Sequence, residues 1–222
     1  MNNWSVASVA QARAEQIISR WRGDPNIIVQ AESAAVLPFL VTFQDPSTLE
    51  APSRVPRYAE RNAAVVRRPG LAHPAQLWVR ASEGFSGYRN AFFRFLKDEY
   101  AIDDAKAQAG GFDVDHLLNR ARAPTGTTLV RVELVRSEVN QAWGRTFEKA
   151  SSDPRFYANR HRERRTMSWM ICAKVGGQMP PGNADDQAGI DRLVGWFNAR
   201  LGLPRDEAEE GLRSMLDFAY RR

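Results

Sequence analysis

The segment from residue 112 to 149 constrains the fold more than any other, because its residue pattern changes from strand to helix within about 40 positions. Phe112–His116 (FDVDH) predicts a strand that ends in charged side chains, and residues 124–126 (PTG) predict a turn. Residues 129–135 (LVRVELV) alternate as a second strand should, and Ser137 is expected to cap the helix that follows. The sequence therefore predicts a strand–turn–strand–helix unit.

The rest of the chain is predicted to be mostly helical, so we expect the α+β class. Apolar residues recur at the spacing of one helix face in several stretches. These stretches predict helices at Val6–Trp21, Tyr88–Tyr100, 155–175, 187–201 and 204–220. Short strands are predicted at 26–30 and 76–80, and the five prolines between residues 45 and 74 predict an irregular, extended stretch.

Two glycine-rich breaks predict three regions. The Ala-Gly-Gly run at 109–111 separates an N-terminal α+β region, residues 1–108, from the strand–turn–strand–helix unit and its basic helix, residues 109–176. A Gly/Pro linker then precedes a C-terminal helical pair, residues 183–222.

The positive charge of the chain is concentrated in one segment. The net charge is +5, but residues 117–174 hold 12 Lys and Arg against 5 Asp and Glu, a balance of +7. The remainder holds 19 basic and 21 acidic residues. Most of the excess is arginine, whose guanidinium group matches phosphate oxygens bidentately. Nucleic acid, and DNA before RNA, is the expected partner; an ordinary solvated basic surface is the alternative.

The composition excludes several kinds of protein. Hydrophobic residues make up 43% of the chain, which is enough to bury a core. Cys172 is the single cysteine, so no internal disulfide and no structural zinc are expected, and its apolar neighbours predict a buried thiol. No apolar run approaches the roughly 20 residues of a membrane span, so no membrane partner is expected. The N-terminal residues lack a signal-peptide profile, which predicts a cytoplasmic protein or one exported by a dedicated secretion system.

Three side chains of the predicted unit suit a catalytic site. Asp115 and His116 end the first strand, and Asn140 lies 25 residues after Asp115, near the start of the helix, so we expect the fold to bring them into one cleft. Asp115 and Asn140 offer the oxygen ligands that Mg²⁺ (or Mn²⁺) prefers, and Asp113, on the same strand face as Asp115, is a substitute ligand. His116 can accept a proton from an attacking water. This set suits metal-assisted hydrolysis of a phosphodiester bond.

Basic side chains around this set are expected to hold flanking phosphates. Three arginines lie close to it in sequence: Arg131, Arg136 and Arg145. The basic helix adds a second group on its expected nucleic-acid face: Arg160, His161, Arg164 and Arg165.

These residues resemble the HNH, or His-metal finger, nucleases, most closely the recombination endonuclease VII branch. In that pattern an Asp-His pair ends the first strand, an Arg stands in the second, and a helical Asn is followed by a Gly. The corresponding residues here are Asp115, His116, Arg131, Asn140 and Gly144. The resemblance implies a ββα-metal finger near residues 112–150, with Asp115 and Asn140 as metal ligands and His116 as general base. It implies a metal-dependent DNA endonuclease, such as a bacterial toxin or mobile-element nuclease, although the zinc-binding cysteines of many members are missing here.

Two other functions remain open from the sequence. The chain could bind nucleic acid through its basic helix without cleaving it. The basic helix could instead meet an acidic partner, such as an inhibitor or immunity protein. In both cases Asp115 and His116 would form an ordinary structural pair, and Asn140 would be placed by packing alone.

Overall fold

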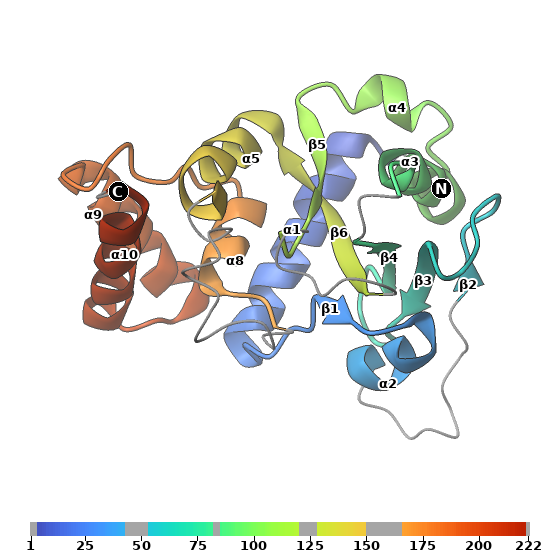
Figure 1. The fold of residues 1–222 in the computed structure, drawn as a ribbon, viewed down its shortest axis with the longest axis horizontal. Coiled ribbons are helices and arrows are strands. Elements are labelled where there is room, and N and C mark those ends of the chain that lie inside the picture. The colour runs from blue at the N-terminus through green and yellow to red at the C-terminus, as the bar shows by residue number, and fades with distance from the viewer. Residues whose placement is uncertain (1–3, 43–52, 82–84, 120–127, 150–165, 221–222) are drawn as a thin grey trace.

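A curled antiparallel sheet lies at the centre of the protein, in a computed structural model that describes residues 4–42, 53–81, 85–119, 128–149 and 166–220 (Figure 1). The strand order is β1–β6–β4–β3–β2, and β5 pairs with β6 as well. The strands are β1 (Gln30–Ala31), β2 (Ser53–Arg54), β3 (Ala63–Arg67), β4 (Ala75–Arg80), β5 (Phe112–His116) and β6 (Leu129–Arg136). The mixture of helices with an antiparallel sheet agrees with the predicted α+β class.

Strand β6 holds the sheet together because it pairs with three other strands. Its first residues pair with β4 as far as Trp78↔Arg131, and its second half pairs with β5. The N–H of Arg131 donates to the carbonyl of Val29, and the carbonyl of Arg131 accepts from the N–H of Leu117. Both backbone groups of one residue point to the same edge of an antiparallel strand, so β1 and β5 follow each other along one edge of β6. Strand β4 takes the other edge.

The side chain of Arg13 fills the place where β4 and β6 separate. Arg13 lies on α1 (Val6–Gly23) and donates to both carboxylate oxygens of Glu133 on β6, at 2.7 Å each. It also donates to the carbonyl of Ala75 on β4 at 2.8 Å. Arg131 donates to the same Glu133 carboxylate at 2.6 and 2.9 Å. All three charged side chains are buried, so an Arg–Glu–Arg network closes this opening in the sheet.

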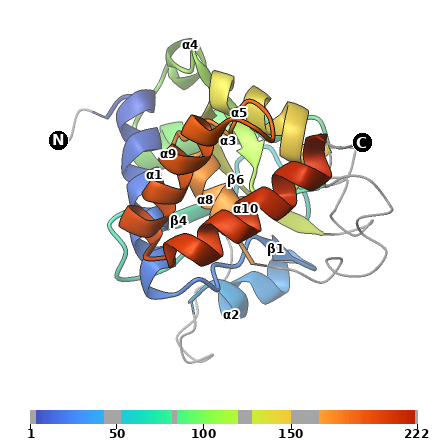
Figure 2. The ribbon, with the colours of Figure 1, turned by 90° about the vertical axis from the view of Figure 1, so that its left-hand side faces the viewer.

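Three apolar cores lie against the sheet among the described residues, and the smallest surrounds Trp78 on β4. One forms under α3 (Tyr88–Tyr100), whose residues Phe92 and Phe95 pack on β3, β4 and the first half of α1. The largest core lies between α1, β6 and the remaining long helices. Figure 1 places α9 and α10 at the far end from β2 and β3, and Figure 2 shows them from that end. The helices of this part are α5 (Ser137–Trp143), the π-helical turn η4 (Gly144–Glu148), α8 (Trp169–Val175), α9 (Gln187–Trp196), the π-helical turn η5 (Phe197–Leu201) and α10 (Arg205–Tyr220).

Most predicted helices and strands are present. Helix α3 and strand β5 have the predicted bounds, and α1 extends the predicted helix by one turn or less. The prediction of an irregular stretch between residues 45 and 74 was wrong in part, because β2 and β3 lie within it. Ser137 does not cap α5; it is the first helical residue, and its side chain bonds elsewhere. Short helical segments were not predicted at η1 (Ala34–Val36), α2 (Leu37–Thr42) and α4 (Ala105–Gln108).

The predicted boundary near residue 108 falls inside one hydrogen-bonded sheet. β6 follows this boundary in sequence, yet it pairs with β1 and β4, which precede it. The prediction of one helix over residues 155–175 was wrong in its described part, because Thr166 forms a β-bridge with Ile28 and Ser168 caps α8, which begins only at Trp169 and packs against α1. No helix among the described residues combines the length and apolar character needed to cross a membrane.

Candidate functional site

Strand β5 presents two different faces to its surroundings. Asp113 and Asp115 are two residues apart and therefore point to one face, whereas Val114 and His116 point to the other. Val114 is buried in the core under α3. The ring of His116 lies against the ring of Tyr88, at the start of α3, with 4.4 Å between centroids. The carboxylate face of β5 is the one that turns toward α5 and α8.

Asp113 joins the strand to the helix of the predicted unit. The amide nitrogen of Asn140 donates to one carboxylate oxygen of Asp113 at 2.9 Å, and the hydroxyl of Ser137 donates to the other at 3.0 Å. Helix α5 begins directly after β6, so its first turns return over the paired strand β5. A carboxylate beside the first turn of a helix is also stabilised by the positive end of the helix dipole.

Asp115 lies one step further along the same face and meets a buried lysine. The ammonium group of Lys174 on α8 is 2.8 Å from Asp115 and also pairs with Glu148 on η4. The side chain of Lys174 is only 3% exposed, against 15% for Asp115 and 32% for Glu148. One cation is thus held between two carboxylates on the face that carries Asp113 and Asn140.

Burial and the charge of the partner shift the pKa values of Asp115 and Lys174 in opposite directions. Burial raises the pKa of Asp115 to about 6, an effect that Glu148 adds to and Lys174 partly offsets. Burial alone would lower the pKa of Lys174, but the carboxylates of Asp115 and Glu148 outweigh it and raise that pKa. Lys174 therefore remains an ammonium ion at neutral pH, while Asp115 can change its charge in the physiological range.

The three residues predicted to share one cleft are not all brought together. Asn140 contacts Asp113, the predicted substitute ligand, and lies over the face that carries Asp115. His116 points to the opposite face of β5, where it packs on Tyr88. The expected convergence of Asp115, His116 and Asn140 is therefore replaced by a group made of Asp113, Asn140 and Asp115, without the imidazole.

The predicted phosphate-binding arginines lie in different environments. Arg131 is 3% exposed and bonded to Glu133, so its guanidinium is inside the sheet network and does not face solvent. Arg136 is exposed and lies 3.8 Å from Glu138, and Arg145 is exposed on η4. These two stand at either end of α5. The predicted contacts Arg160, His161, Arg164 and Arg165 fall outside the described residues.

Lys174 and Glu148 were not predicted as members of this group. Lys174 is one charge within an apolar helical run (WMICAKV), and such a residue is buried only when an anion meets it. That local signal identifies the lysine but not its partners. Asp115 and Glu148 are 59 and 26 positions away in sequence, since 174 − 115 = 59 and 174 − 148 = 26.

The oxygen atoms on this face suit a hard divalent cation. Mg²⁺ is often held by one or two carboxylates and keeps several waters, so the carboxylate of Asp113 and the amide oxygen of Asn140 fit its preferences. Asp115 and Glu148 already hold a cationic group, the ammonium of Lys174. Across the described ranges, no three His, Cys, Asp or Glu side chains gather in a way that could hold a metal ion. Any metal here would rely on Asn140 and water for part of its coordination.

Comparison with known protein families, with curated proteins and with solved structures found no match.

Proposed function

We propose that this chain is a metal-dependent endonuclease that hydrolyses phosphodiester bonds in DNA, with its site on the carboxylate face of β5. The observation that carries the proposal is the contact between Asn140 and Asp113, which joins the helix of the strand–turn–strand–helix unit to its first strand. This contact brings an amide side chain of the helix next to a carboxylate of the strand, so that oxygen atoms of both elements lie close together. The Asp-His, Arg and Asn-Gly resemblance to the HNH nucleases supports the same reaction.

In this proposal Asp113 and Asn140 supply the oxygen atoms that hold Mg²⁺ or Mn²⁺. A bound divalent ion would stabilise negative charge on the phosphate and on the leaving oxygen. Asp115 is the carboxylate on this face that can accept a proton from water, and Lys174 fixes its position. Arg136 and Arg145 flank α5 and can contact phosphates on either side of the scissile bond.

His116 stands apart from this arrangement. The sequence assigns it the role of general base, but its ring packs on Tyr88 across β5 from Asp113. A base must come within hydrogen-bond reach of the water that it deprotonates. The variants in the experiment therefore change the carboxylate face of β5 and its partner Asn140.

The proposal is tested by incubating supercoiled plasmid with purified protein in EDTA, Mg²⁺ and Mn²⁺. We expect nicking with either metal and none in EDTA. Asn140→Ala and Asp113→Asn should each lower the rate at least tenfold, because each removes an oxygen ligand or its charge. Glu209→Gln, on the exposed face of α10, is the matched control and should cut as the unchanged protein does. Thermal melting of each variant separates lost chemistry from lost folding.

Two results would overturn the proposal. One is the absence of cleavage with any divalent metal in a folded protein. The other is cleavage at an unchanged rate by folded Asn140→Ala and Asp113→Asn, which would place the activity elsewhere or in a contaminant.

A second candidate function is binding of nucleic acid without cleavage. The ion group around Lys174 speaks against a metal centre there, because two carboxylates and an ammonium already satisfy one another, and the exposed Arg136 and Arg145 can contact phosphates without any cleavage. Retardation of DNA in a gel by a protein that never cleaves it would support this alternative.

A further inference from the structure

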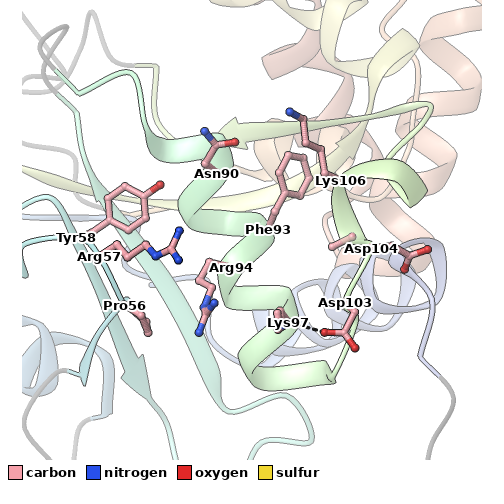
Figure 3. A pocket seen from close by; sticks show the side chains of 11 residues that line it. Pro56, Arg57, Tyr58, Asn90, Phe93, Arg94, Lys97, Asp103, Asp104 and Lys106 are labelled. Carbon is pink, nitrogen blue, oxygen red and sulfur yellow. Dashed lines mark ion pairs between the residues drawn. The ribbon is translucent and has the colours of Figure 1, made fainter.

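A pocket on the other side of the protein has features that the proposed nuclease site does not use. Its volume is about 400 Å³, and it lies between the turn after β2, the outer face of α3 and the start of α4 (Figure 3). Pockets of roughly 300–1,000 Å³ hold small organic ligands. The size therefore fits one small molecule or one residue of a polymer.

The backbone of Arg57 is held in a conformation that does not suit arginine. The N–H of Tyr58 donates to the carbonyl of Val55 at 3.0 Å, which closes a turn with Pro56 and Arg57 at its centre. Arg57 has φ = +73°, the left-handed region, and a turn with proline at its first central position normally has Gly or Asn at the second. The chain thus keeps a strained arginine where glycine would be relaxed. Strain of this kind is concentrated at ligand-binding positions.

The side chain of Arg57 extends into the pocket toward α3 (Figure 3). In the described part of the chain it forms no ion pair, and Lys106, on α4, forms none either. The other two cations of the wall are already engaged. Arg94 pairs with Asp98 at 3.1 Å and Lys97 pairs with Asp103 at 2.5 Å.

The outer face of α3 supplies the rest of the wall. Asn90, Phe93, Arg94 and Lys97 recur at three- and four-residue spacing and so share one side of the helix, opposite the aromatic face that packs in the core. The rings of Phe93 and Tyr58 are only partly buried and give the pocket apolar walls. The pocket thus combines four cationic side chains with two carboxylates, those of Asp103 and Asp104, and adds an amide and aromatic rings, so its lining carries a net positive charge.

We propose that this pocket binds a nucleotide through its phosphate and its base. Guanidinium forks match phosphate oxygens, so Arg57, whose side chain forms no ion pair among the described residues, holds the phosphate. Aromatic rings accept the face of any base, so Phe93 and Tyr58 hold the base, and the amide of Asn90 meets the polar edge of the base. The pocket lies across α3 from the carboxylate face of β5, so this site is independent of the proposed cleavage.

The test measures binding of adenosine 5′-monophosphate by calorimetry in EDTA, where metal-dependent cleavage cannot occur. Arg57→Gly is the decisive variant, because glycine adopts positive φ without strain. It should melt at or above the temperature of the unchanged protein, yet bind the nucleotide at least tenfold more weakly. Arg213→Gln, on α10, is the matched control for loss of one arginine and should bind as the unchanged protein does.

Three further ligands then test the base contact, the phosphate contact and the kind of molecule bound. Adenosine and inorganic phosphate should each bind much more weakly than the monophosphate, because each lacks one of the two contacts. A short single-stranded oligonucleotide that displaces the monophosphate identifies the ligand as part of a strand, and failure to displace it identifies a free nucleotide. Equal affinity of Arg57→Gly and the unchanged protein, or no binding of the monophosphate at millimolar concentration, would overturn the proposal. Asp113→Asn should bind normally, so failure of the nuclease proposal leaves this test intact.

Discussion

Replacing Glu133 by Gln should remove a large share of the stability of the protein. Glu133 is 2% exposed and accepts four hydrogen bonds, two from Arg13 and two from Arg131. Glutamine has nearly the same shape but no charge and only one acceptor oxygen. The variant would leave two buried guanidinium ions with no anion between them.

The expected cost is about 3–5 kcal/mol, the range found when one partner of a buried ion pair is removed. Whole domains are stable by roughly 5–15 kcal/mol, so this loss is severe. With a urea m-value of about 3 kcal/mol/M for a chain of this size, the unfolding midpoint should fall by about 1 M or more. Glu209→Gln is the matched control. Its pair with Arg213 is 42% exposed on both sides, so the cost should stay below about 1 kcal/mol.

The pH dependence gives a second check on the same network. Burial alone would raise the pKa of Glu133, but Arg13 and Arg131 outweigh it and hold that pKa below its ordinary value. A carboxyl with a lowered folded pKa contributes stability above its unfolded pKa and loses it as pH falls through the folded one. The difference in unfolding free energy between the unchanged protein and Glu133→Gln should therefore be constant above pH 5. It should shrink in stronger acid. A urea midpoint for Glu133→Gln within 0.3 M of the unchanged protein, about 1 kcal/mol, would refute the reasoning.

Three further outcomes follow from single contacts. Lys174→Met should lower the free energy of unfolding by about 3 kcal/mol at pH 7.5 and by clearly less at pH 5. At pH 5 Asp115, whose pKa is raised to about 6, is protonated and needs no cation beside it. Melting curves at both pH values check this. Gly202→Ala should cost about 1 kcal/mol because its φ is +75°, whereas Gly144→Ala, in open space within a helical turn, should be neutral or stabilising, as urea unfolding can show. Cys172 is buried, which raises the pKa of its thiol, so it should react with a thiol reagent only after denaturation; rapid reaction of the folded protein would contradict this burial.

Periodicity predicted the elements that have one apolar face. Helix α3 matches its predicted bounds because Phe92, Phe95 and their neighbours mark one side of a helix clearly. Strand β3 was missed because Ala63–Val66 is buried on both faces and therefore does not alternate. A short apolar run between prolines gives no local signal that distinguishes such a strand from a loop.

Long-range charge pairing explains most of what could not be predicted at the candidate site. Arg131 and Glu133 alternate with apolar residues in β6, which is typical of a strand with one solvent face. They are buried because Arg13, 120 positions away from Glu133, meets them inside the protein. No local pattern reveals such a partner. The same is true of Lys174, whose anion partners come from β5 and η4.

Strand geometry also decides what His116 can do. Neighbouring residues of a strand point to opposite faces, so Asp115 and His116 can converge only if the chain leaves strand geometry between them. Here pairing continues through His116↔Val132 and on to the bond between Leu117 and Arg131. The imidazole is therefore fixed on the side of Tyr88, away from Asp113.

This separation leads to a ranking of variants that differs from the one the sequence alone predicts. By analogy with the HNH nucleases, His116→Ala should abolish cleavage, since it removes the general base. The geometry of β5 instead predicts that Asp113→Asn will lower the rate of plasmid nicking more than His116→Ala does. Both variants should be assayed at a temperature at which melting curves show each of them to be folded. This control is needed because Asp113 accepts hydrogen bonds from Ser137 and Asn140, and its loss also loosens α5. If His116→Ala is inactive and Asp113→Asn retains most of the activity, the end of β5 must rearrange when DNA and metal bind, and the carboxylate face is not where the reaction occurs.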